Sequence, residues 1–252
     1  MDETQQRRIQ EILNNGYEFD LGEFLSLGFD LFKKNIGGHV AFTVVFFFIT
    51  LITAVIPVVG GFALLLLYPA LSVGWFVAAH KDHKGEPQEF RNFFKGFDHL
   101  GSLAFMFLIM VVAYITVLLP FMKFFVENIE NNIDLIATEL NFFEGIPTWV
   151  YLVFIPFVYL AVSWRWAPML IVFYKMKPWQ ALETSRMLIG RKFWMFLLFF
   201  VITGLIAQMG QVVFLVGLVL TYPIGMCMEY AAFASVTGLM QEETDIVDHL
   251  ID

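Results

Sequence analysis

The sequence predicts an all-α polytopic membrane bundle: six transmembrane helices arranged as three tandem hairpins, with interfacial amphipathic helices. Three observations lead to this fold class. The chain is 59% hydrophobic and holds 30 phenylalanines in 252 residues, and its mean hydropathy is +0.72, so it is more apolar than ordinary soluble domains. Its apolar residues gather in long runs. Its lysines and arginines lie almost entirely on one side of those runs.

Six apolar segments are near the length of ~20 helical residues that crosses a hydrocarbon core. They are Ile36 to Pro57, Phe62 to Ala79, Leu100 to Pro120, Ile146 to Phe173, Phe193 to Ala207 and Val212 to Leu239. The polar N-terminal stretch carries no apolar core of a signal peptide, so we expect the first span to insert uncleaved. The chain then divides into a cytoplasmic N-terminal tail (1-19), a membrane domain (20-240) and an acidic cytoplasmic C-terminal tail (241-252).

Lysine and arginine predict the orientation, because acidic residues hardly influence it. Of the 15 basic residues, all but Lys123 and Arg165 lie in the N-terminal tail or in loops after even-numbered spans. Lys123 falls in an opposite loop and Arg165 inside the fourth span. We therefore expect both termini on the cytoplasmic side.

A short amphipathic segment precedes each odd-numbered span. The first is "DLGEFLSLGFDLFKK", in which Asp20 and Glu23 form a capping box. The second, "PQEFRNFFKGF", places phenylalanines at helical spacing, and the third, "KPWQALETSRMLIGRK", has Pro178 at its start. Aromatic faces flanked by lysine and arginine are typical of helices that lie in the membrane interface. An ordinary cytoplasmic extension of each span is the alternative.

The second and sixth spans resemble each other, with Tyr68 and Pro69 recurring as Tyr222 and Pro223. This match indicates a parallel repeat of hairpins. Proline removes a helical hydrogen bond, so Pro69 and Pro223 are predicted helix kinks.

The one substantial outer loop, Phe121 to Gly145, has apolar residues at helical spacing and acidic residues on the opposite side. It predicts an amphipathic helix that either covers the outer end of the bundle or docks another protein.

Arg165, in "SWRWAP", is the only charge in its apolar run, and Glu229, in "MCMEYAAF", is the only acid within any span. Arg165 lies ten residues before Lys175 and Glu229 twelve before Gln241, so both sit ~15 to 18 Å from the cytoplasmic ends of their segments. An unpaired charge at that depth is costly. We predict an intramembrane ion pair; snorkelling of Arg165 to cytoplasmic headgroups is the alternative.

Sites for catalysis or metals are not apparent. A single cysteine, Cys227, excludes an intrachain disulfide and a cysteine-based zinc site. His80 and His83 beside Asp82 could bind a metal, but we interpret them as a solvated turn, and His39 as interfacial. No catalytic or phosphate-binding motif occurs. We expect neither an enzyme nor a cofactor.

Three stretches carry a resemblance: "LGEFLSLGFDLFKKN", "ALETSRMLIGRKFW" and "GLVLTYPIGMCMEYAAF". With them the chain resembles a broad bacterial family of uncharacterised six-span inner-membrane proteins, similar to the YciC-like proteins and to the membrane domain attached to some glycerophosphodiester phosphodiesterases. The resemblance implies the fold and a bacterial inner-membrane location, and brings no catalytic residues.

Two classes of function remain. The compact loops and the lack of midplane polar groups favour an interaction or scaffold subunit of a larger inner-membrane complex, with lipids and a membrane protein as partners and no nucleic acid. The alternative is a transporter or lipid-handling protein that uses Arg165 and Glu229. If the protein is a scaffold subunit, we expect a solid bundle with no continuous water-filled path.

Overall fold

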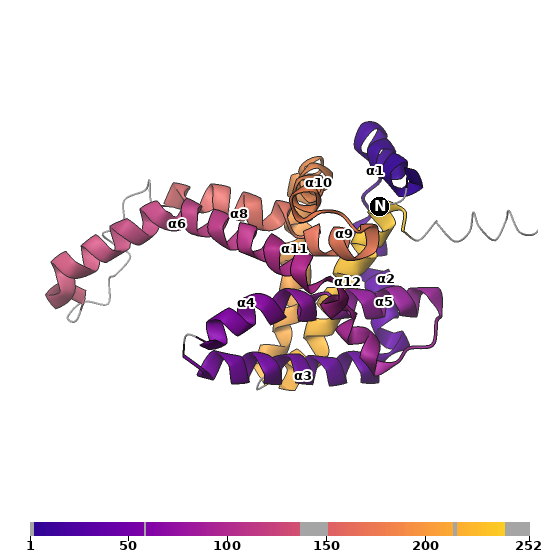
Figure 1. Ribbon diagram of the computed structural model, residues 1–252, viewed down its shortest axis with the longest axis horizontal. Coiled ribbons are helices and arrows are strands. Elements are labelled where there is room, and N and C mark those ends of the chain that lie inside the picture. The colour runs from indigo at the N-terminus through magenta and orange to yellow at the C-terminus, as the bar shows by residue number, and fades with distance from the viewer. Residues whose placement is uncertain (1–2, 58, 137–150, 214–215, 240–252) are drawn as a thin grey trace, which may run out of the picture.

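A computed structural model describes residues 3–57, 59–136, 151–213 and 216–239 (Figure 1). These residues form helices and no strand. Six stretches are long and apolar enough to cross a membrane: Ile36–Val55, Val59–Lys84, Phe90–Phe124, Phe154–Tyr174, Phe193–Val212 and Gly217–Thr237. The predicted all-α fold of a multi-pass membrane protein is thus confirmed.

The spans form three consecutive hairpins. The first joins α3 (Ile36–Val55) to α4 (Val59–Ser72) and α5 (Gly74–Lys84). The second joins α6 (Leu100–Ile136) to α8 (Phe154–Ser163) and α9 (Ala167–Tyr174). The third joins α11 (Phe193–Gln208), through η2 (Met209–Val213), to α12 (Val216–Thr237). In Figure 1 the first two hairpins run along the long axis of the molecule, and α11 and α12 run steeply across them.

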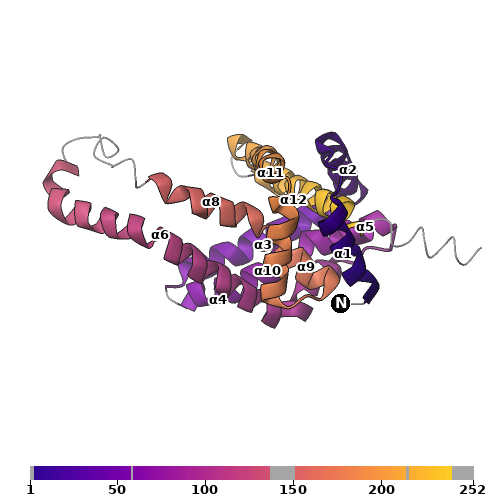
Figure 2. The same cartoon turned by 90° about the horizontal axis from the view of Figure 1, so that it is seen from above.

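The helix α12 forms the centre of the molecule, and α6 forms its margin. α12 contacts α2, α3, α5 and α11, and its side chains from Tyr230 to Ala234 are fully buried. By contrast, only 17% of the apolar window in the α6 span is buried. Figures 1 and 2 both show α6 reaching away from the other helices with α8 beside it.

The three amphipathic segments are helical, but protein covers much of each apolar face. They are α2 (Leu21–Lys34), η1 (Phe90–His99) and α10 (Pro178–Gly190), and an N-terminal helix, α1 (Glu3–Asn15), precedes them. Asp20 caps α2 as predicted, because its Oδ1 accepts from the Glu23 N–H at 3.0 Å. Gly28 of α2 lies so close to α12 that an added Cβ would fall 2.3 Å from Met228 Cα. The face we expected to meet the membrane interface is therefore largely an internal packing face.

The predicted outer helix is the end of α6, which continues from the third span through Pro120 to Ile136. The remainder of that segment, up to Gly145, lies outside the described residues. Along its described part, Lys123 pairs with Glu127 at 3.8 Å on the exposed side.

Both prolines that are predicted to kink their spans lie inside helices. α12 runs as one helix through Pro223, and α4 continues for three residues past Pro69 to Ser72. The second span is interrupted at Val73, four residues after Pro69, and the fourth span is broken between Ser163 and Ala167, at "SWRWAP". Pro168 explains the break, since it has no N–H for the carbonyl of Trp164. That carbonyl accepts from the Ala167 N–H at 3.1 Å instead.

Candidate functional site: an ion pair between two pockets

The structure brings Arg165 and Glu229 together. Arg165 Nε lies 2.8 Å from Glu229 Oε1 and 3.0 Å from Oε2. The two residues come from the break in the fourth span and from the second half of α12. The pair therefore ties the second hairpin to the third at the position where the sequence placed both charges.

The break that carries Arg165 is held by one serine of the surface helix α10. Ser185 Oγ donates to the carbonyl of Ser163 at 2.7 Å and accepts from the Trp166 N–H at 3.1 Å. All three residues are buried. A backbone group freed by a helix break must find such a partner when it lies away from water. Ser185 thus fixes the backbone on both sides of Arg165.

The two partners differ sharply in exposure. The Arg165 side chain is 52% exposed, whereas that of Glu229 is 3% exposed. Arg165 reaches the carboxylate through Nε alone, and among the described residues no other group accepts a hydrogen bond from its guanidinium. Its Cζ also lies 5.8 Å from the centre of the Phe200 ring. The terminal nitrogens of Arg165 are therefore open toward the space around them.

That space consists of two pockets separated by the ion pair. One, of about 260 Å³, lies toward α4 and α6 and is lined by Tyr68, Met106 and Tyr114. The other, of about 390 Å³, lies toward α11. Five residues line both pockets: Ala161, Arg165, Tyr222, Met226 and Glu229. The bundle is therefore not completely filled beside the ion pair.

The tyrosines of the repeated Tyr-Pro pairs meet at the first pocket. Tyr68 and Tyr222 both line it, and their rings lie 5.9 and 6.1 Å from that of Phe46, measured between centroids. The second and sixth spans thus present matching tyrosines to the same side of Arg165.

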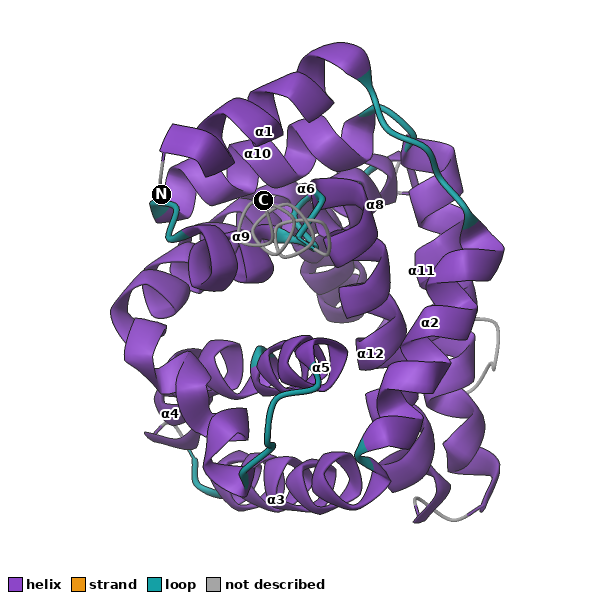
Figure 3. Cartoon of the chain, turned by 90° about the vertical axis from the view of Figure 1, so that its right-hand side faces the viewer, coloured by secondary structure: helices purple, strands orange, loops and turns teal. Residues whose placement is uncertain are grey.

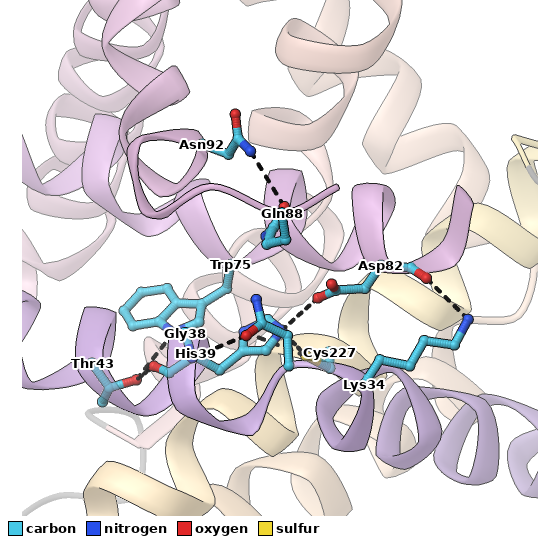
Figure 4. A network of polar contacts seen from close by, with 10 residues as sticks. Lys34, Gly38, His39, Thr43, Trp75, Asp82, Gln88, Asn92 and Cys227 are labelled. Atoms are coloured by element: carbon cyan, nitrogen blue, oxygen red, sulfur yellow. Dashed lines mark hydrogen bonds and ion pairs between the residues drawn. The ribbon is translucent and has the colours of Figure 1, made fainter. Parts of the chain in front are cut away.

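A second polar cluster, which we call the His39 cluster, consists of the buried residues His39, Asp82 and Cys227 and of the exposed Lys34 (Figure 4). His39 Nε2 lies 3.0 Å from Asp82 Oδ2 and 3.8 Å from Cys227 Sγ. Lys34 Nζ donates to the Asp82 carbonyl at 2.9 Å. Our interpretation of His39 as interfacial and of Asp82 as part of a solvated turn is wrong, since both are buried.

A pattern in the sequence could have placed Asp82 in the core. Trp75, Ala78, Ala79 and Asp82 follow one another at i, i+3, i+4 and i+7 of α5, and all four are buried. The aspartate occupies the last position of an apolar helical face. His80, which lies off this face, approaches the Tyr230 hydroxyl at 2.7 Å through Nδ1.

The geometry of the His39 cluster does not fit a nucleophilic triad. In such a triad the thiol and the carboxylate engage opposite ring nitrogens. Here Asp82 and the Cys227 sulfur both lie nearest to Nε2, with the sulfur 4.0 Å from Nδ1. The three side chains are also enclosed. No group of three or more metal-binding side chains occurs in the described part of the chain.

No family model, curated protein or solved structure matches the chain. The site is therefore interpreted from its own geometry.

Proposed function

We propose that this membrane protein handles lipids: it holds the headgroup of an anionic lipid, or of a similarly amphipathic anion, at Arg165 between its spans. One observation carries this proposal. A half-exposed arginine whose terminal nitrogens are open stands between two pockets inside the membrane-crossing part of the chain.

The chemistry of the guanidinium supports an oxyanion ligand. Phosphate and carboxylate groups accept two parallel hydrogen bonds from an arginine fork. Glu229 uses Nε, so it holds the side chain in place and leaves the terminal nitrogens for a ligand. A buried carboxylate also compensates the charge while no ligand is bound, which lowers the cost of keeping an arginine at this depth.

The walls of the pockets support an apolar chain attached to that oxyanion. Met106, Phe107 and Met110 of α6 line the first pocket, and Phe200 of α11 lines the second. Methionine and phenylalanine side chains accommodate flexible hydrocarbon well. A ligand with both parts is a lipid, which reaches such pockets from within the bilayer.

The broken fourth span supports the same reading. Binding sites of membrane carriers commonly form at interrupted helices near the bilayer midplane. Arg165 occupies such an interruption, and Ser185 of α10 hydrogen-bonds to the backbone on both sides of it.

Native mass spectrometry of the full chain in mild detergent tests the proposal. We expect phosphatidylglycerol to bind more tightly than phosphatidylcholine, and Arg165→Gln to weaken phosphatidylglycerol about tenfold or more. Ala161→Trp, which fills both pockets and keeps the ion pair, should do the same. Lys123→Gln, on the exposed end of α6, is the matched control. Equal lipid binding by all four proteins would exclude the proposal.

A second candidate function is an interaction or scaffold subunit of a larger inner-membrane complex. The observation that favours it is an apolar stripe on the exposed side of α6, at alternating spacings of three and four residues: Phe105, Leu108, Val112, Ile115, Leu119, Met122 and Val126. That spacing forms the seam of paired helices. Purification in gentle detergent at native expression should then recover a membrane partner at fixed stoichiometry, and Ile115→Trp should release it.

We further propose that the chain lies in the bacterial cytoplasmic membrane with both termini inside, acts by binding rather than catalysis and binds no nucleic acid. The distribution of lysine and arginine supports the orientation, and the family resemblance supports the membrane. A reporter fused after Asp252 and a cysteine label at Asn131 should mark opposite sides of the membrane. Labelling from one side would contradict the six-span topology.

A further inference from the structure

A separate cleft lies between the N-terminal helix α1 and the surface helix α10, which lie side by side in Figure 3. We call it the α1–α10 cleft; it has a volume of about 740 Å³. α1 contributes Gln10, Leu13 and Asn14 to its walls, and Tyr159 of α8 also lines it. The remaining lining residues are Arg186, Met187, Gly190 and Arg191.

The two helices are held together beside the cleft. The Tyr17 hydroxyl, just after α1, donates to the carbonyl of Leu188 in α10 at 2.6 Å. Lys192 Nζ lies 5.4 Å from the centre of the Tyr17 ring. Burial raises the pKa of Tyr17 well above its ordinary value, although the nearby Arg191 lowers it in part. The wall contributed by α1 is therefore fixed by a neutral, hydrogen-bonded phenol.

The side chains that line the cleft carry net positive charge. Arg186 is already paired, with Nε 2.9 Å from Glu183 Oε2 and Nη1 3.4 Å from the Tyr159 hydroxyl. Arg191 forms no salt bridge with any residue in the described ranges. The amides of Gln10 and Asn14 add further donors, and no carboxylate lines the cleft. An oxyanion is the ligand that such a lining favours.

The cleft also joins a membrane span to a polar helix. Tyr159 belongs to the fourth span, whereas Gln10 and Asn14 belong to a polar helix before the first span. Trp194, three residues after Arg191 at the start of α11, is 78% exposed. Exposed tryptophans are typical of the headgroup level of a bilayer.

We propose that the α1–α10 cleft binds a phosphate group, with Arg191 as the main charged contact and the amides of Gln10 and Asn14 as further donors. The phosphate belongs to a lipid headgroup or to a soluble phosphate ester. This site is distinct from Arg165 and does not depend on the lipid proposed there, because the two sites share no lining residue.

Thermal unfolding of the full chain in nanodiscs tests the site and its ligand source. In phosphatidylcholine nanodiscs, added inorganic phosphate or glycerol phosphate should raise the midpoint if the cleft takes soluble esters. Phosphatidic acid in the nanodisc should raise it if the cleft takes a headgroup. For whichever of these ligands raises the midpoint, we expect Arg191→Gln to weaken binding about tenfold to a hundredfold.

Gly190→Phe is a second variant, which fills the cleft without removing a charge; nothing lies within 4 Å of a Cβ added there. It should abolish the same response. Arg91→Gln, at a surface pair with Glu89, is the control and should change nothing. Ala161→Trp should also leave the response intact, which separates this site from the Arg165 pockets. No response in either arm, or a response that survives both Arg191→Gln and Gly190→Phe, would overturn the proposal.

Discussion

The Arg165–Glu229 pair and the His39–Asp82 pair both join helices distant in sequence, but they differ in access. Arg165 is 52% exposed beside two pockets. His39 and Asp82 are enclosed, and Cys227 closes one side of the ring. Each pair satisfies a polar group inside an apolar bundle. Only the first leaves donors open to a ligand, so it is a candidate binding site, whereas the second fastens α3 to α5 and α12.

The largest expected effect comes from breaking the open pair at its exposed member. Arg165→Met leaves the Glu229 carboxylate buried without its partner and should cost up to about 3–5 kcal/mol. Glu229→Gln should cost less, because the remaining arginine has access to the pockets. The double variant Arg165→Met/Glu229→Met should recover much of the stability. Folded yield after heating in detergent measures all three; equal losses in the two single variants would contradict the asymmetry.

Opening the enclosed cluster should have a smaller effect. Asp82→Ala removes the acceptor for His39 and should destabilise the protein by about 1–3 kcal/mol. Asp82→Asn keeps an oxygen at that position and is the conservative control. Neither change should alter lipid binding at Arg165, which native mass spectrometry can check. A loss of lipid binding with intact folding would show that the two pairs act together.

Access itself can be compared by thiol labelling. Cys227 is fully buried, so a maleimide should label it only after unfolding. Ala161→Cys in a Cys227→Ala background places a thiol on the wall of both pockets, and it should react in the folded protein in detergent. Rapid labelling of native Cys227 would remove the distinction between an open and an enclosed site.

The smallest effect is expected at a surface pair, which serves as the reference for both buried ones. Hydrogen bonding from Arg186 lowers the pKa of Glu183. The folded-state pKa of Glu183 lies below its unfolded value. The pair therefore contributes to the stability of the fold at neutral pH, and this contribution is lost as the pH falls through the folded-state pKa. Both side chains are about 40% exposed, so Glu183→Gln should cost only ~0–1 kcal/mol at pH 7. Melting curves from pH 7 to pH 3 compare the variant with the native chain.

The sequence predicted the parts of the fold that depend on rare residues in an apolar background. The six spans follow from hydropathy, and the Arg165–Glu229 pair follows from there being one charge of each sign at one depth. Proline alone does not say where a helix breaks. Pro223 is accommodated within a continuous helix, whereas Pro168 breaks one. The difference is tertiary, because Ser185 of another helix satisfies the broken backbone.

The pockets and the His39 cluster were harder to predict. Pockets depend on how helices cross, which periodicity does not encode. His39 and Asp82 are 43 residues apart in the sequence. Taken alone, each is simply a polar residue near the end of a span. Only their shared packing against α12 brings them to Cys227.

An experimental structure in a lipid nanodisc tests the central claim most directly. With phosphatidylglycerol present, we predict density for an oxyanion within hydrogen-bonding distance of the terminal nitrogens of Arg165, and an acyl chain along Met106 and Met110 or along Phe200. The ion pair to Glu229 should persist through Nε. Pockets closed by α4 and α11 around a fully enclosed Arg165, with no ligand density, would contradict the account.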